Sequence, residues 1–156
     1  MSEIKSMIAK QLDALLSNEN NNIANMANAS ALLMQSMKDI SWAGFYLYDK
    51  QNDELILGPF QGKVACVHIK NGRGVCGTAL KEQKTKRVKN VNEFPGHIAC
   101  DSDSKSEIVI PIMKDGKNYG VLDIDAPILN RFSIEDENIL REFVKVFINH
   151  LNIDKV

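Results

Sequence analysis

Helical spacing of apolar residues marks both ends of the chain. Apolar side chains recur every three or four positions over residues 2–16 and about residues 22–37, which predicts two amphipathic helices. The same spacing predicts a last helix over about residues 134–149, with Ser133 as its N-cap and Asp136 adding charge to the first turn. The positions predicted to face inward are Ile4, Met7, Ile8, Leu12, Leu15, Leu16, Ile23, Met26, Ala27, Leu33, Met34, Met37, Ile139, Leu140, Phe143, Val146 and Phe147.

The middle of the chain carries short runs of β-branched and aromatic residues between turn-forming residues, which predicts strands. Residues 107–113 and 118–126 form the clearest hairpin. A glycine-rich turn precedes a short helix predicted over residues 75–82, and the polar residues 92–105 are assigned to a loop. The other predicted strands are residues 41–48, 54–57, 64–69 and 87–91.

This order of elements predicts an α+β protein. Helices at the chain ends beside antiparallel hairpins favour a central antiparallel sheet with the N- and C-terminal helices on one face. The other face is then free to form a pocket beneath residues 61–105. No repeat or linker interrupts the sequence, so we expect one domain over residues 1–156, with its sheet and pocket segment at about residues 40–126.

Composition and charge narrow the classes of function. Hydrophobic residues make up 44% of the chain and charged residues 25%, which is ordinary for a globular domain. A net charge of -1 gives no bulk electrostatic reason to bind nucleic acid or an anionic membrane. The first residues lack a signal pattern, and no apolar run is long enough to span a bilayer, so we expect a cytoplasmic protein.

Side-chain alternation gives one face of the predicted sheet its chemical character. Trp42 and Tyr46 share one face of their strand, opposite Phe45. Asp123 and Asp125 likewise share one face of the strand at residues 118–126. We therefore expect an aromatic wall and an acidic wall on the side of the sheet that is free to form a pocket.

Whether Glu107 joins the two aspartates depends on the turn of the hairpin. A two-residue turn at residues 115–116 would put Glu107 on the opposite face, whereas a three-residue loop at residues 114–116 with a glycine bulge puts it opposite Asp123 and diagonal to Asp125. We favour the three-residue loop because it also aligns the apolar residues of both strands on the core face, namely Ile110, Ile112, Leu122 and Ile124.

Three acids on one wall have a chemical consequence. Clustered carboxylates cannot all ionise cheaply, so the pKa of at least one should rise. A carboxylic acid that stays protonated near neutral pH can donate a proton to a substrate oxygen. A solvated polar face is the alternative, but Val109, Pro111 and Val121 on the same wall favour a partly covered surface.

The three cysteines allow four interpretations. They are packed as small hydrophobes, bind zinc together with His68 and His97, act as a redox sensor, or catalyse thiol chemistry. An odd number of cysteines does not suit a permanent disulfide framework. Cys76 falls in the first turn of the predicted helix, where a thiolate is stabilised, and Cys100 lies in a polar, accessible loop. The neighbouring acids of Cys100 would instead raise its pKa.

Residues 72–77 (GRGVCG) match the glycine pattern of a dinucleotide-binding loop. That fold requires a buried, apolar parallel strand after the helix, and residues 85–90 (TKRVKN) are mostly polar. The glycines are better explained by a tight turn and close packing of a helix.

The chain resembles the free methionine-(R)-sulfoxide reductases, which are single GAF-domain enzymes. The resemblance covers most of the chain and is clearest from about residue 41 to residue 151. The most specific feature is the cysteine set, with ten positions from Cys66 to Cys76 and twenty-four from Cys76 to Cys100. The motifs that carry the resemblance are residues 41–46 (SWAGFY), 57–62 (LGPFQG), 72–77 (GRGVCG) and 121–125 (VLDID).

The resemblance implies a reaction without a bound cofactor, in which free methionine-(R)-sulfoxide is reduced to methionine. Cys100 would attack the sulfoxide sulfur and become a sulfenic acid as methionine leaves. Cys66 would resolve it as a disulfide that thioredoxin reduces, and Cys76 would serve as a recycling or alternative resolving thiol. No metal is implied.

The resemblance also implies the substrate contacts. Trp42 would pack on the methyl group with Tyr46 nearby, and backbone amides of Ile98, Ala99 and Cys100 would bind the carboxylate. The acids that would hold the sulfoxide oxygen and the amino group are Glu107, Asp123 and Asp125.

Two other functions compete with this enzyme. A GAF-type sensor would bind a small ligand or report oxidation through its cysteines, but would not turn over. A zinc protein would hold metal on its cysteines and histidines. A homodimer formed through exposed helical surface is compatible with any of the three functions.

Overall fold

An antiparallel sheet of six strands, in the order β3-β2-β1-β6-β5-β4, organises the described part of the chain. The protein is represented by a computed structural model that describes residues 6–97 and 103–153. Its strands are β1 (Trp42–Asp49), β2 (Glu54–Gln61), β3 (His68–Lys70), β4 (Lys86–Val88), β5 (Ser106–Lys114) and β6 (Lys117–Ala126). Its α-helices are α1 (Met7–Leu15), α2 (Asn22–Ser36), α3 (Gly74–Glu82) and α4 (Ile134–His150), and Val91–Glu93 form a 3-10 turn.

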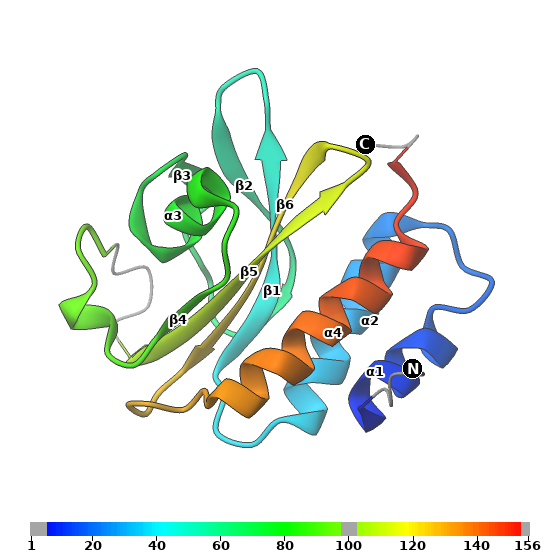
Figure 1. Ribbon diagram of the computed structural model, residues 1–156, viewed down its shortest axis with the longest axis horizontal. Helices are drawn as coiled ribbons and strands as arrows, with labels where there is room; N and C mark the ends of the chain where they lie inside the picture. The colour runs from blue at the N-terminus through cyan, green and yellow to red at the C-terminus, as the bar shows by residue number, and fades with distance from the viewer. Residues whose placement is uncertain (1–5, 98–102, 154–156) are drawn as a thin grey trace.

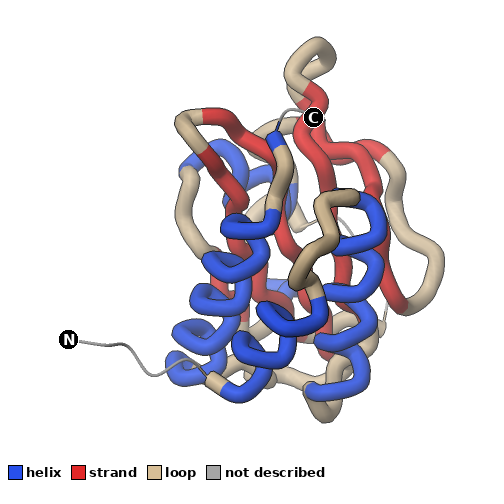
Figure 2. The backbone as a smooth tube through the Cα atoms, turned by 90° about the vertical axis from the view of Figure 1, so that its right-hand side faces the viewer, coloured by secondary structure: helices blue, strands red, loops and turns tan. Residues whose placement is uncertain are grey.

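Helices α1, α2 and α4 cover one face of the sheet, as Figures 1 and 2 show. The core between them contains Phe45 of β1 and alternate apolar residues of β5 and β6. The rings of Phe45 and Phe147 lie 4.8 Å apart between their centroids, so sheet and helix are in direct contact. The other face is covered by α3 and the loops around it (Figure 1). The predicted α+β layering is therefore confirmed.

The helix boundaries follow from their caps. Ser133 accepts a hydrogen bond from the Asp136 amide while the Asp136 carboxylate accepts one from the Ser133 amide, which confirms the predicted start of α4. Ser6 caps α1, so this helix begins later than predicted. Four predicted inward positions were wrong, because their side chains are exposed: Met7 at 71%, Leu15 at 45%, Ile23 at 68%, and Ala27. In α2 the buried face instead includes polar residues that have hydrogen-bond partners, such as Ser30 on the Met26 carbonyl.

The turn between β5 and β6 differs from the prediction. Lys114 pairs with Lys117 across the two residues Asp115 and Gly116, whose φ angles are both positive, at 53° and 77°. Positive φ at both positions suits a tight hairpin turn. The three-residue loop was therefore wrong.

A bulge then restores the orientation that the two-residue turn would have lost. Met113 pairs with Asn118 and Ile112 with Gly120, which leaves Tyr119 as an extra residue in β6. The pairing beyond the bulge puts Glu107 opposite Asp125. The three acids thus share one face, as predicted, but Glu107 does not oppose Asp123.

Residues 64–67 do not form a strand, contrary to the prediction of one strand over residues 64–69. The strand β3 begins only at His68. The preceding carbonyls are taken by side chains of β1: Trp42 Nε1 donates to Lys63 O at 3.0 Å and Tyr46 Oη donates to Cys66 O at 2.9 Å. Because these side chains satisfy the backbone, the segment lies over the sheet face as a loop.

Gly120 sits where no side chain fits, which gives a prediction on stability. It adopts φ 153°, and a Cβ there would overlap the backbone carbonyl of Tyr46 on β1. We expect Gly120→Ala to lower the free energy of unfolding by about 3 kcal/mol, measured by urea denaturation. Gly116→Ala is the control, because φ is also positive but nothing lies within 4 Å of the added Cβ. A loss in Gly120→Ala no larger than in Gly116→Ala would contradict the close approach of β1 and β6.

Candidate active site

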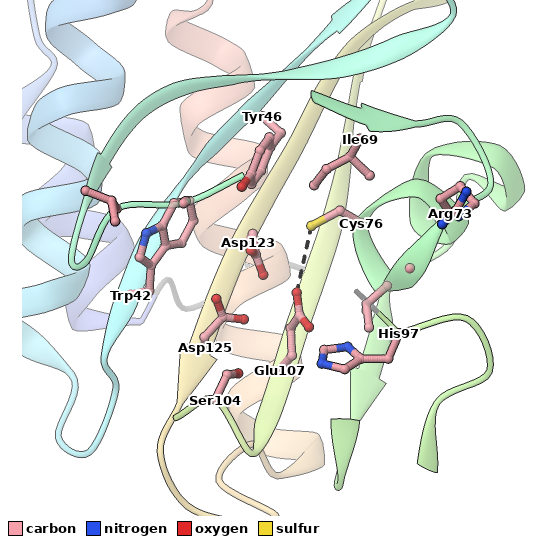
Figure 3. Close-up of a pocket in the computed structure, with 14 residues that line it drawn as sticks. Trp42, Tyr46, Ile69, Arg73, Cys76, His97, Ser104, Glu107, Asp123 and Asp125 are labelled. Carbon is pink, nitrogen blue, oxygen red and sulfur yellow. Dashed lines mark hydrogen bonds between the residues drawn. The ribbon is translucent and has the colours of Figure 1, made fainter. Parts of the chain in front are cut away.

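A small cavity opens on the sheet face that is opposite helices α1, α2 and α4 (Figure 3). Its floor comes from the sheet and one wall from α3, and its volume is about 50 Å³. The described residues that line it are Trp42, Tyr46, Val64, Ala65, Ile69, Arg73, Gly74, Val75, Cys76, His97, Ser104, Glu107, Asp123 and Asp125. The predicted pocket and its aromatic and acidic walls are therefore brought together in one place.

The aromatic wall is rigid. Trp42 and Tyr46 are both buried, and Trp42 is stacked between Tyr46 at 5.8 Å and Phe60 at 5.0 Å between ring centroids. Their alternation on β1 places them on the pocket face, while Phe45 faces the helices. Such a wall offers a flat apolar surface to a small ligand, and its rings are already packed in place.

The acidic wall is largely buried. Glu107 and Asp123 are 7% and 5% exposed, and Asp125 lies beside them on β6 (Figure 3). Burial, followed by the charges of Asp125 and Glu107, raises the pKa of Asp123 well above its ordinary value. The expectation that the pKa of one clustered carboxyl rises is thus met by Asp123. Its Oδ1 atom is buried and has no hydrogen-bond partner among the described residues.

Cys76 lies in the first turn of α3 and points at the acids. Its Sγ donates to Glu107 Oε2 at 3.8 Å (Figure 3). Burial comes first, and the charges of Asp123, Glu107 and Asp125 follow, in raising the pKa of this thiol. A stabilised thiolate at Cys76 was therefore a wrong prediction, because desolvation and the acids outweigh the helix dipole.

Cys66 and Cys76 are in different chemical states. Cys66 is disulfide-bonded, whereas Cys76 is a free, buried thiol. Cys100, Ile98 and Ala99, the other predicted site residues, lie outside the described residues. The hydroxyl of Tyr46, a pocket residue, donates a hydrogen bond to the Cys66 carbonyl, next to Ala65 of the pocket lining.

Ser104 is a pocket residue that the sequence did not reveal. It is buried, and its Oγ has no hydrogen-bond partner within the described ranges. Arg73 and His97 also line the cavity (Figure 3). One serine in a polar loop carries no periodicity, so only the fold shows that it faces the acids.

The zinc interpretation is not supported by the positions of its candidate ligands. His68 Nδ1 lies 2.6 Å from Glu54 Oε2, on the exposed side of β3. Cys66 is disulfide-bonded. These two residues therefore do not form a ligand set with Cys76.

The glycine segment is structural, as predicted. A Cβ on Gly77 would lie 2.5 Å from the Lys70 carbonyl oxygen, and the Gly72 amide donates to Gly77 O at 2.9 Å. The strand after α3 is β4, which pairs antiparallel with β5. A dinucleotide-binding unit would need a parallel strand there, so its exclusion is confirmed. Among the described helices, none has the length and apolar character needed to cross a membrane.

The match to a family profile agrees with this architecture. The profile of the GAF domain covers residues 13–151. This match, with the antiparallel sheet, the helices on one face and the small cavity on the other, defines the class of the protein as a GAF domain.

Similar proteins within this class identify the family more narrowly. The free methionine-R-sulfoxide reductase of Escherichia coli is 49% identical over 142 residues, which cover 91% of this chain and 85% of the relative. The structure of fRMsr of Staphylococcus aureus in its reduced form superposes with a TM-score of 0.90 at 50% identity, covering 97% of this chain and 100% of that one. The free methionine-R-sulfoxide reductase from Neisseria meningitidis, solved in complex with its substrate, gives 0.89 at 42% identity, with 92% and 85% covered. The chain belongs to the free methionine-R-sulfoxide reductase family of GAF-domain proteins.

Proposed function

We propose that this protein reduces free L-methionine-(R)-sulfoxide to L-methionine. The observation that carries the proposal is a carboxyl, Asp123, whose pKa is raised inside a small cavity that has an aromatic wall and is lined by Ala65, the residue before the disulfide-bonded Cys66. The similarity to relatives that bear the name of this activity supports it.

Sulfoxide reduction needs a proton at the oxygen, since oxide is a poor leaving group. Asp123 is the acid best suited to supply it, because burial and its acidic neighbours keep it protonated at higher pH than an ordinary aspartate. Glu107 and Asp125 beside it would hold the substrate ammonium. Trp42 would pack against the methyl group, with Tyr46 next to it, and the backbone at Ile98 and Ala99 would receive the carboxylate.

The electrons come from thiols. The Cys100 thiolate attacks the sulfoxide sulfur while Asp123 protonates the oxygen. The S–O bond of the substrate then breaks, the hydroxyl passes to the Cys100 sulfur as a sulfenic acid, and methionine leaves. The Cys66 thiol then displaces water from the sulfenic acid and forms a Cys66–Cys100 disulfide. A disulfide-bonded Cys66 beside a free Cys76 supports this assignment.

Cys76 suits the pocket wall better than the role of nucleophile. Its thiol is buried and its pKa is raised, so little of it would be thiolate near neutral pH. We therefore propose that it contacts the substrate and acts as a recycling thiol only after Cys66 and Cys100 have reacted.

A thiol cycle of this kind needs a reductant and a reducing compartment. We propose thioredoxin as the partner that reduces the disulfide, with no bound prosthetic group, and the cytoplasm as the location. We also propose a homodimer formed through helical surface, whose test is the mass of the protein in solution.

The test is NADPH oxidation with thioredoxin, thioredoxin reductase and this protein. We expect turnover with free L-methionine-(R)-sulfoxide and none with the (S) epimer. Absence of turnover with either epimer, in protein shown to be folded and reduced, would exclude the enzyme. It would favour the alternative of a sensor that binds a ligand or switches through its cysteines.

Tyr46→Phe should separate the two chemical steps. The variant keeps the ring but loses the hydrogen bond that fixes the Cys66 backbone. Losing about 1 kcal/mol of positioning should slow disulfide formation by about fivefold. In one turnover without thioredoxin, the rate of methionine release should fall less than the rate at which free thiols disappear, because the thiols report disulfide formation.

Tyr48→Phe is the matched control for this experiment. Tyr48 lies on the same strand face, but its hydroxyl donates to Asp53 at an exposed turn, away from Cys66. Equal slowing of both steps in Tyr46→Phe would mean that the hydroxyl acts on the substrate rather than on the Cys66 segment.

A further inference from the structure

We propose that the reduced protein binds a thiophilic divalent cation, Zn²⁺ or Cd²⁺, on Cys76, Glu107 and Asp123, inside the cavity of the candidate active site. The bound ion would inhibit the enzyme, because the ion and the substrate would occupy the same space. The binding itself stands on geometry alone, and only the inhibition rests on the proposed function.

The three side chains already converge. One potential ligand atom from each, the Cys76 sulfur and a carboxylate oxygen of Glu107 and Asp123, lie within 4.8 Å of one another. Tetrahedral zinc with one sulfur and one oxygen ligand separates these atoms by about 3.6 Å. The Cys76 Sγ–Glu107 Oε2 distance is 3.8 Å, so this pair needs almost no adjustment. The widest pair would have to close by about 1 Å, within reach of side-chain rotation.

Asp123 gives an independent indication of a missing ligand. Its side chain is buried, and its Oδ1 has no hydrogen-bond partner in the described parts of the chain. Buried carboxylate oxygens without partners are rare in folded proteins, and each calls for a specific explanation. Figure 3 shows this carboxyl in the cavity between Cys76 and Asp125.

Electrostatics favours a cation with two charges. Three groups that can become anions, namely Cys76, Glu107 and Asp123, face one another in a buried space. Asp125 adds a further acid to the same wall. A divalent ion would relieve this repulsion, since it deprotonates a coordinating thiol and neutralises the carboxylates. The mixed sulfur and oxygen donors suit zinc or cadmium rather than magnesium or calcium.

The test uses a variant in which Cys76 is the last thiol, Cys66→Ser with Cys100→Ser, titrated with Cd²⁺ alone. We expect a thiolate-to-cadmium charge-transfer band that saturates at one ion per chain and releases protons to the buffer. Adding Glu107→Gln or Asp123→Asn should weaken binding at least about tenfold, as much as the loss of an outer-shell partner usually costs. Glu135→Gln, an exposed acid at the start of α4, is the matched control and should leave the affinity unchanged.

No band, or a band whose affinity is insensitive to both acid substitutions, would overturn the site. A second measurement uses the natural sequence, fully reduced, in one turnover without thioredoxin. Zn²⁺ should slow methionine formation, and excess methionine sulfoxide should restore the rate. Inhibition that substrate does not relieve would overturn the shared cavity. A cadmium band in the double variant, together with no methionine from the reduced natural sequence without added metal, would exclude the proposed function and leave the metal site standing.

Discussion

Replacing Cys100 with serine should abolish turnover entirely, and this is the largest effect that we expect. A serine hydroxyl is too weak a nucleophile toward the sulfoxide sulfur and cannot form a sulfenic acid. The coupled assay with NADPH and thioredoxin should therefore show no oxidation above background. One turnover with stoichiometric enzyme should also yield no methionine.

Cys66→Ser is the matched variant, because it removes the other thiol of the proposed pair. It should release about one methionine per enzyme and then stop, since the sulfenic acid forms but is not resolved. A reagent specific for sulfenic acids should label this variant only after substrate is added. Methionine formed by Cys100→Ser, or no methionine formed by Cys66→Ser, would contradict the assigned order of attack and resolution.

The sequence predicted the sheet and its two faces because side-chain alternation is a local property. Trp42 and Tyr46 had to share a face opposite Phe45, and the structure places them so. Asp123 and Asp125 followed by the same rule. The start of α4 was predictable too, since Ser133 and Asp136 form a cap within four residues.

The errors have two sources: the local geometry of one hairpin turn, and contacts between distant parts of the chain. The turn at Asp115 and Gly116 is tight because both residues accept positive φ, and the bulge at Tyr119 then corrects the alternation. The alternation pattern of each single strand does not show that a turn and a bulge will offset each other. Cys66 was placed on a strand because nothing local shows that Tyr46 would take its carbonyl.

Chemical state was harder still to predict than position. Cys76 occupies the helical first turn that the sequence indicated, yet burial raises the pKa of its thiol, and the charges of Asp123 and Glu107 on the other side of the cavity add to this shift. Ser104 entered the site with no sequence signal. Burial and the facing charges are tertiary properties, and they decide which of the reactive residues can ionise.

Asp123→Asn should lower activity and raise stability together. The amide cannot protonate the sulfoxide oxygen, so we expect the one-turnover rate to fall by about 100-fold. In the natural protein, the rate should also fall as pH rises through the raised pKa of Asp123, and this limb should be missing in the variant. Asp125→Asn is the matched control on the same strand, and we expect it to slow the chemical step less because Asp125 is only half-buried.

The gain in stability follows from the direction of the shift. A carboxyl whose folded pKa is raised stabilises the fold fully only below its unfolded pKa of about 3.8, and this contribution is lost as pH rises toward the folded pKa. The asparagine variant has no such loss. The free energy of unfolding is to be measured in urea from pH 4 to pH 8. The value for the variant minus the value for the natural protein should therefore increase by roughly 1–2 kcal/mol as pH rises. A difference that stays constant with pH would mean that Asp123 ionises normally in the fold, and the proton donor would then have to be sought in Glu107 or Asp125.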